Sequence, residues 1–327
     1  MGVEIAVQWG QIKTLFILCF LVLDVFLISQ FFGNFDSNPS YLQQSTKEED
    51  LRANVEGLDN LEKEVLEESY LFATRKEFGE EDVESLSQFK NQNIVIVNSD
   101  LGSLVVSKFI EPVPINTDSY SETLQANIFE SNKYQLWTKD ENSNTLIFFQ
   151  NMDKTIYFNQ GGLLLVVLND EGQMIQYVQT MLVKEEKQLD SEDLITAFEA
   201  VSNLHYNAKV IHTGDKVTNR GDIGYHNIYG LPNGSQVLAP TWRIEVNNER
   251  NYFVNAVEGH YYQRYEGDFL RETILSFRDS IQAADESEFL FVNDEEEETI
   301  QLVDEIIQEF SNLNDTTIGV EKNDFEL

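Results

Sequence analysis

The chain has 327 residues, with 22 Lys plus Arg against 57 Asp plus Glu, and its formal net charge is -35. So acidic a surface repels phosphate backbones and anionic headgroups, which excludes nucleic acid as a partner and indicates that the folded part stands off a membrane surface. The one cysteine is Cys19, so the rest of the sequence has no disulfide, catalytic thiolate or zinc-thiolate site.

Residues 14–32 (TLFILCFLVLDVFLISQFF) are apolar on all sides and carry one charged residue, Asp24. At ~1.5 Å per residue such a helix crosses a ~30 Å hydrocarbon core, whereas a buried helix of a soluble protein seldom runs this far without a polar face. No small-x-small cleavage site follows, so we expect an uncleaved transmembrane anchor rather than a signal peptide. Lys13 precedes the segment and Lys47 is the first cation after it. This asymmetry predicts residues 1–13 in the cytoplasm and the bulk of the chain outside the cell membrane.

Asp24 is costly at mid-membrane, because insertion scales assign an ionised carboxylate there about 2.5 to 3.5 kcal/mol. A hydrogen-bond donor on another helix would relieve this cost, and a protonated carboxyl facing lipid is the alternative. Polar residues at this depth mediate helix association. We therefore predict a helix-recognition face that consists of Phe20, Leu21, Asp24, Ile28 and Phe31.

The residues after the anchor predict a stalk and then a first extracytoplasmic domain. Residues 33–46 are polar without periodicity, as in a stalk. Residues 47–78, broken near Gly57, and 80–89 have a helical apolar period. Short apolar runs between turn clusters then predict strands at 93–97, 103–109, 133–138, 145–150, 155–158, 163–168 and 174–182. Helices followed by hairpin-linked strands indicate the α+β class for this domain, residues 47–186.

A weaker copy of this plan predicts a second small α+β domain over residues 187–265, with the boundary near 184–187. Asp190 or Ser191 can cap a helix. After an irregular Gly-rich stretch, 213–233, strands are predicted at 236–238, 241–246, 251–257 and 260–265. The two halves resemble each other in pattern rather than residue by residue.

The last part, residues 266–327, has 19 Asp plus Glu against 3 Lys plus Arg, which predicts a solvated acidic tail. Within it, one apolar helix face is formed by Ile300, Val303, Ile306, Ile307 and Phe310. An amphipathic helix over 300–310 could dock on the domain, dock on a partner or do neither. Because both predicted cores precede the tail, we expect residues 47–265 to fold as a soluble fragment without disulfide or metal.

The sequence contains no pattern that predicts catalysis. It has no G-x-S-x-G, Walker A or H-E-x-x-H motif, and its four histidines are not spaced as paired ligands on one helix. Carboxylate pairs occur throughout so acidic a chain and are typical of solvated surface. We therefore predict no catalytic, cofactor-binding or metal-binding residues and no cofactor.

Three stretches resemble the YycI (WalI) family. They are residues 8–17 (QWGQIKTLFI), residues 239–246 (APTWRIEV) and residues 252–259 (YFVNAVEG), the last of which looks like the end of a PepSY-type module. The resemblance covers about residues 8–265. Three features depart from it: residues 1–6 are an extension or an upstream start, with Val7 as the alternative initiator; Asp24 stands where relatives often have an amide; and the tail is longer and more acidic.

The resemblance implies a fold with two PepSY-like, YycH-like outer domains and a non-enzymatic function. Members of the family regulate the sensor kinase WalK of the WalK/WalR two-component system, which controls cell-wall metabolism in Gram-positive bacteria, together with YycH. The implied partners are WalK and a YycH-like protein that forms a heterodimer with this chain. A membrane-anchored PepSY-type binding or protease-inhibitory module is the first alternative, and a cell-wall enzyme is the second. We name Tyr225, Tyr229, Tyr261 and Tyr262 as candidate contacts of the outer domains and expect Trp242 in the core of a sheet.

Overall fold

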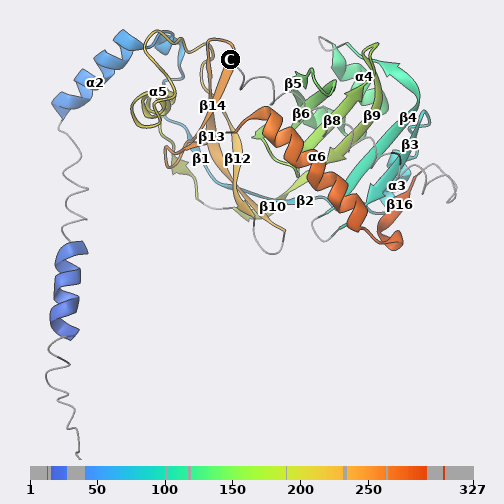
Figure 1. Ribbon diagram of the computed structural model, residues 1–327, viewed down its shortest axis with the longest axis horizontal. Coiled ribbons are helices and arrows are strands. Elements are labelled where there is room, and N and C mark those ends of the chain that lie inside the picture. Colours follow the sequence, from blue (N-terminus) through green and yellow to red (C-terminus); the bar gives the residue numbers. More distant parts are fainter. Residues whose placement is uncertain are drawn as a thin grey trace, which may run out of the picture. The chain divides into compact units, whose positions relative to one another are not determined.

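The computed structural model describes residues 13, 16–27, 41–99, 102–116, 119–188, 190–230, 234–262, 264–292 and 305 (Figure 1). The chain divides into two compact units, residues 1–56 and residues 57–327. The first unit contains a helix over residues 16–27 and the helix α2 (Tyr41–Asn54). Helix α2 therefore begins within the stretch that the sequence predicted to be a stalk.

The described part of the predicted membrane segment is helical and exposes its apolar side chains. Phe20 is 61% exposed and Leu21 is 58% exposed. Residues 14, 15 and 28–32 of the predicted span lie outside the described residues. Among the helices that the structure describes, none is both long enough and apolar enough to cross a membrane.

The second unit contains a first sheet that is antiparallel throughout. Its order is β5 (Tyr134–Asp140), β6 (Thr145–Met152), β8 (Leu163–Leu168), β9 (Gln173–Thr180), β4 (Leu104–Pro114), β3 (Gln92–Val97) and β16 (Phe289–Phe291). Most of these strands coincide with predicted apolar runs. Together with the helices described next, they confirm the α+β class.

Successive residues of a strand point to opposite faces of a sheet, and in these strands the residues on both faces are apolar. Helices therefore cover both faces of the first sheet. On one face, α3 (Glu80–Leu86) and α4 (Tyr120–Asn127) contribute Leu86 and Leu124 to a core with Phe148 and Val166. On the other face, α6 (Glu266–Ala283) runs diagonally across the strands (Figure 1). Its buried side chains are Phe269, Leu270, Thr273, Ile274, Phe277 and Ile281. Short 3-10 turns occur at Leu58–Asn60, Ser131–Lys133 and Glu286–Glu288.

A second sheet is centred on β13 (Gln236–Val246), which pairs with β2 (Leu71–Arg75), β12 (Asp222–Gly230) and β14 (Arg250–Asn255). Strand β10 (Leu182–Gln188) pairs with β2, and β15 (Tyr261–Tyr262) pairs with β14. The helix α5 (Ala197–Ser202) is capped by Thr196 and continues as a π-helical turn, Asn203–Asn207. A separate ribbon joins β1 (Glu67–Glu68) to β11 (Glu192–Asp193). Trp242 is 1% exposed, which confirms its predicted place in the core of a sheet.

The two sheets are joined by β7 (Lys154–Tyr157), which is antiparallel to β6 of the first sheet and parallel to β12 of the second. The strands can approach this closely because β12 has Gly224 at the contact. A Cβ atom there would lie 2.3 Å from Cε2 of Tyr157 and 2.5 Å from the backbone oxygen of Thr155. Gly224 therefore sets the spacing between the sheets.

Three further sequence-based expectations are corrected by the structure. The stretch 213–233, which was expected to be irregular, contains strand β12, which pairs with β13 from Asp222 to Gly230. The helix predicted over 47–78 ends at Asn54, and β2 lies where its last turns were expected, because Leu71, Phe72 and Ala73 form a continuous buried run between two strands rather than one helical stripe. Residues 266–291 are not a solvated tail, because α6 and β16 belong to the core. A soluble fragment must therefore extend beyond residue 265. The division into domains 47–186 and 187–265 stays a prediction.

Candidate functional site

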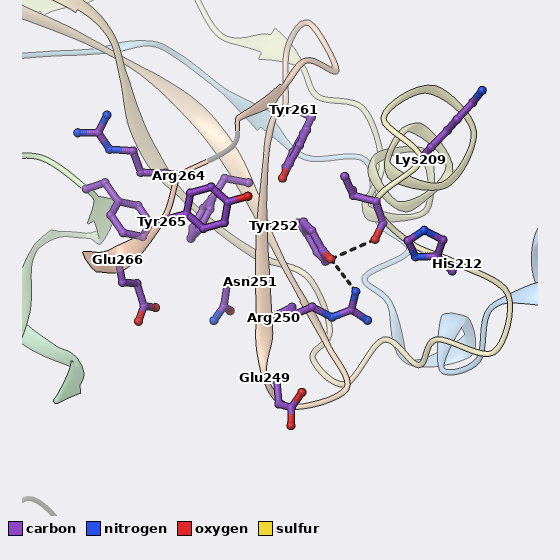
Figure 2. Close-up of a pocket in the computed structure, with 13 residues that line it drawn as sticks. Lys209, His212, Glu249, Arg250, Asn251, Tyr252, Tyr261, Arg264, Tyr265 and Glu266 are labelled. Atoms are coloured by element: carbon purple, nitrogen blue, oxygen red, sulfur yellow. Dashed lines mark hydrogen bonds between the residues drawn. The ribbon is translucent and has the colours of Figure 1, made fainter. Parts of the chain in front are cut away.

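A groove with a volume of about 570 Å3 lies where β14, β15 and the start of α6 approach the turn at residues 209–212 (Figure 2). Tyrosines and cationic side chains line it side by side. The main ones are Lys209, Arg250, Tyr252, Tyr261, Arg264 and Tyr265. Three of these side chains are cations, in a chain whose net charge is -35.

Tyrosine rings form an aromatic wall of this groove. Tyr252 is fixed, because its hydroxyl donates to the backbone oxygen of Val210 at 3.1 Å and accepts from Nη1 of Arg250 at 3.0 Å. The ring centroid of Tyr261 lies 5.9 Å from that of Tyr252, with the ring planes inclined at 57°. Tyr265 is 62% exposed, which is high for so large a ring. These rings offer flat apolar contact at little entropic cost, because a tyrosine has only two side-chain torsions to fix.

Two of the three cations around the tyrosines, Arg250 and Arg264, are held by carboxylates of neighbouring elements. Nη2 of Arg250 lies 2.7 Å from Oδ1 of Asp215, and Nη2 of Arg264 lies 2.7 Å from Oε2 of Glu272. Burial alone would raise the pKa of Asp215, but the hydrogen bonds from the His212 backbone, Asn247 and Arg250 outweigh it and lower that pKa. Such ion pairs orient the guanidinium groups without using all of their five donors.

Lys209 is the least constrained of the three cations. It is exposed, has a φ of 58° and has no ion-pair partner among the residues that the structure describes. The acidic residues Glu249 and Glu266 complete the rim. The groove therefore combines aromatic faces with donors and acceptors of both charges, which is the chemistry of binding a polar or amphipathic partner.

Strand β15 is held in place from behind by a turn and a ring stack. Oδ1 of Asn255 accepts from the backbone nitrogens of Val257 and Glu258, at 2.8 and 3.0 Å, and Gly259 closes the turn with a φ of 75°. Tyr262 stacks on His226 with ring centroids 4.6 Å apart. Burial, and secondarily the charge of Arg264, lowers the pKa of His226. The turn therefore sets the position of Tyr261 at the groove.

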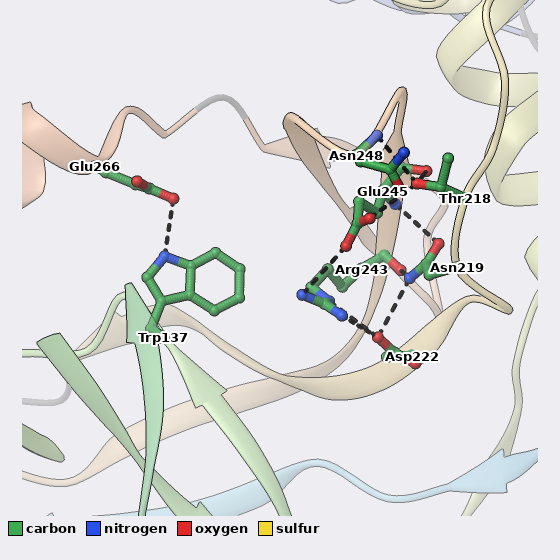
Figure 3. A network of polar contacts seen from close by, with 8 residues as sticks. All are labelled: Trp137, Thr218, Asn219, Asp222, Arg243, Glu245, Asn248 and Glu266. Carbon is green, nitrogen blue, oxygen red and sulfur yellow. Dashed lines mark hydrogen bonds and ion pairs between the residues drawn. The ribbon is translucent and has the colours of Figure 1, made fainter. Parts of the chain in front are cut away.

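A polar network connects the second sheet to α6 beside the groove (Figure 3). Arg243 forms an ion pair with Asp222 through Nη2, and its Nε donates to the same carboxylate at 3.0 Å. Its guanidinium carbon lies 5.5 Å from the ring centroid of Trp137, and Nε1 of Trp137 donates to Glu266 at 2.9 Å. The first turn of α6 is thereby connected to both sheets.

The tyrosines predicted as outer contacts lie in different environments in the structure. Tyr261 lies at the groove. Tyr225 is buried in β12, where its hydroxyl bonds Glu68 at 3.3 Å and where burial, with the Glu68 charge, raises its pKa to about 12. Tyr262 is half-buried against His226, and Tyr229 pairs with Val237 in the sheet register. Tyr252 was not predicted as a contact from the sequence, although it lies two residues after Arg250 in the same strand.

The predicted membrane contacts are described in part. Phe20, Leu21 and Asp24 are exposed residues of the helix over 16–27, and Ile28 and Phe31 lie outside the described residues. No cluster of side chains suited to a metal ion occurs in the described ranges.

A family model described as YycI protein matches residues 36–257, which is more than half of the chain. The match includes strands β2, β10, β12, β13 and β14 of the second sheet, with Arg250, Tyr252 and Asn255, and ends before β15 and α6. No curated protein matches the chain.

Proposed function

The chain belongs to the YycI family, a family of regulatory proteins rather than a known enzyme family, and we propose that it is a membrane-anchored regulator of the sensor kinase WalK. In this proposal residues 14–32 anchor the chain, and Asp24 with its neighbours on the helix contacts other membrane helices. The domains after the anchor lie outside the cell and pair with a YycH-like protein. The observation that carries the proposal is the family match over residues 36–257.

We further propose that the tyrosine groove is the contact site of the outer region. Interfaces are enriched in tyrosine and arginine, because both bury large areas while keeping hydrogen-bond capacity. The groove presents Tyr261 and Tyr265 beside Arg264, whose side chain is 35% exposed. Its guanidinium group is oriented by Glu272 and is therefore pre-positioned for a further acceptor.

Affinity purification of the full-length protein from native membranes tests both parts. We expect wild-type protein to recover a histidine kinase and a YycH-like protein, and Tyr261→Ala with Arg264→Ala to reduce the YycH-like recovery. Arg278→Ala is the matched control, because Arg278 is also an ion-paired arginine of this region, bonded to Asp279, but does not line the groove. Recovery without a histidine kinase or a YycH-like protein would contradict the function. Unchanged recovery in the groove variant would contradict only the location of the contact.

A further inference from the structure

Beside the core that packs against α6, a row of side chains on the same face crosses the first sheet from strand to strand. The cluster that packs with α6 includes Ile147, Leu165, Val178 and Val106. Two residues further along each strand, on the same face, the next positions are Thr145, Val167, Gln176 and Lys108. The strand register places them side by side, as Thr145 pairs with Val167, Val167 with Gln176 and Gln176 with Lys108.

This row is closed to solvent although it lies outside the α6 cluster. Thr145 and Gln176 are each 1% exposed, and Val167 is 9% exposed. Nε2 of Gln176 has no hydrogen-bond partner among the described residues. A polar row sealed to this degree requires a cover beyond α6.

One contact identifies the cover. Nζ of Lys108, at the end of the row, lies 2.7 Å from Oε2 of Glu305, a helical residue 197 positions later in the sequence. The side chain of Glu305 is 46% exposed and that of Lys108 is 34% exposed, as expected at the rim of a covered surface. Glu305 follows Leu302 by three residues and borders the apolar stripe of Ile300, Val303, Ile306, Ile307 and Phe310.

We infer that residues 300–310 form an amphipathic helix that docks on the first sheet beside α6, over the row from Thr145 to Lys108. The apolar stripe covers Val167 and the aliphatic stems of Gln176 and Lys108, and Glu305 fixes the register through its ion pair. The long-range pairing decides between the alternatives that the sequence left open. The chain thereby covers its own sheet face.

Zero-length carbodiimide coupling of the full-length protein tests the docking directly. It joins an amine to a carboxylate only where the two already touch, so we expect a Lys108–Glu305 linked peptide in the monomer band of a denaturing gel. Lys108→Arg keeps the charge but removes the reactive amine, and it should abolish this peptide. A linked peptide found only in a dimer band would instead assign the cover to a second copy and overturn the inference.

Thiol labelling measures the cover itself. In a Cys19→Ser background, Val167→Cys should react slowly with a thiol reagent. In a chain that ends at Val292 the same cysteine should react at least roughly tenfold faster, because labelling then needs no opening step.

Reversal of the charges tests the ion pair. Lys108→Glu should accelerate labelling in the full chain, and adding Glu305→Lys should restore protection. Lys139→Glu, which breaks an ion pair with Glu141 elsewhere on this sheet, is the control and should have no effect. Thr145→Cys repeats the measurement if Val167→Cys does not fold. Equal labelling with and without residues 293–327 would refute the cover.

Discussion

Substitution of Gly224 by alanine tests how the two sheets are joined. The added Cβ would lie 2.3 Å from Cε2 of Tyr157 and 2.5 Å from the backbone oxygen of Thr155. The Tyr157 ring cannot swing away freely, because it is 4% exposed and its centroid lies 4.9 Å from that of Phe253. Overpacking of this kind costs about 3 kcal/mol at its upper range, and the loss of glycine freedom in the unfolded chain offsets about 1 kcal/mol. We therefore expect a destabilisation of about 2 kcal/mol.

The assay is thermal unfolding of the full-length protein followed by tryptophan fluorescence, since Trp137 lies 5.9 Å from Tyr157 between ring centroids. A loss of about 2 kcal/mol lowers the Tm by about 4–8 °C in a unit of this size. Gly267→Ala is the matched control. A Cβ there meets nothing within 4 Å, and alanine should stabilise α6 by about 0.5–1 kcal/mol. If Gly224→Ala leaves the Tm unchanged or raises it as Gly267→Ala does, the close approach of β7 and β12 is refuted.

Three further predictions concern separate parts of the chain. Burial lowers the pKa of His226 in the folded protein, so the unfolded chain binds the proton first as the pH falls. The stability that depends on neutral His226 is therefore complete above about pH 6.5 and is lost below it. His226→Gln should reduce this pH dependence of the free energy of unfolding, measured by urea titration at about pH 5.5 and 7.5. Trp242→Phe removes the 2.8 Å hydrogen bond from Nε1 to the Ile195 oxygen, so the free energy of unfolding should fall by about 1–3 kcal/mol, and an unchanged denaturant midpoint would contradict that bond. Asp24→Leu should weaken the proposed membrane complex, whereas Asp24→Asn should retain it through a hydrogen bond worth roughly 0.6 to 2 kcal/mol. Equal two-hybrid signals of wild type and both variants with the proposed kinase partner, at equal membrane levels, would refute recognition by this residue.

The strands of the first sheet could be predicted because each is a short apolar run between turn residues. Leu163–Leu168 is buried at all positions and was predicted with the same bounds. Strand β2 could not be predicted in this way. Its five residues follow a charged stretch whose leucines and valines also fit a helical period, and only pairing with β10 and β13 decides the outcome. Tertiary pairing thus overrides the local pattern there.

The groove and the position of α6 could not be predicted from the sequence either, but for a different reason. The net charge of residues 266–327 indicated a solvated tail, yet the apolar residues from Phe269 to Ile281 form a buried stripe within the first third of that stretch. Averaging charge over the whole segment concealed this stripe. Tyr252 and Arg264 are 12 residues apart in the numbering, and only the return of the chain to the first sheet brings them to one surface.

The path of the chain makes the groove depend on both sheets. Tyr252 and Tyr261 belong to the second sheet, whereas Arg264 and Glu266 lead into α6, which packs on the first. Between them, the ring of Phe158 lies 5.2 Å from that of Phe253 in β14 and 5.3 Å from that of Phe269 in α6, with edge-to-face geometry in both pairs. Close-packed rings of this kind resist gradual deformation, so a change in the angle between the sheets must repack them. A partner that contacts Tyr261 and Arg264 together would therefore bridge the second sheet and the start of α6.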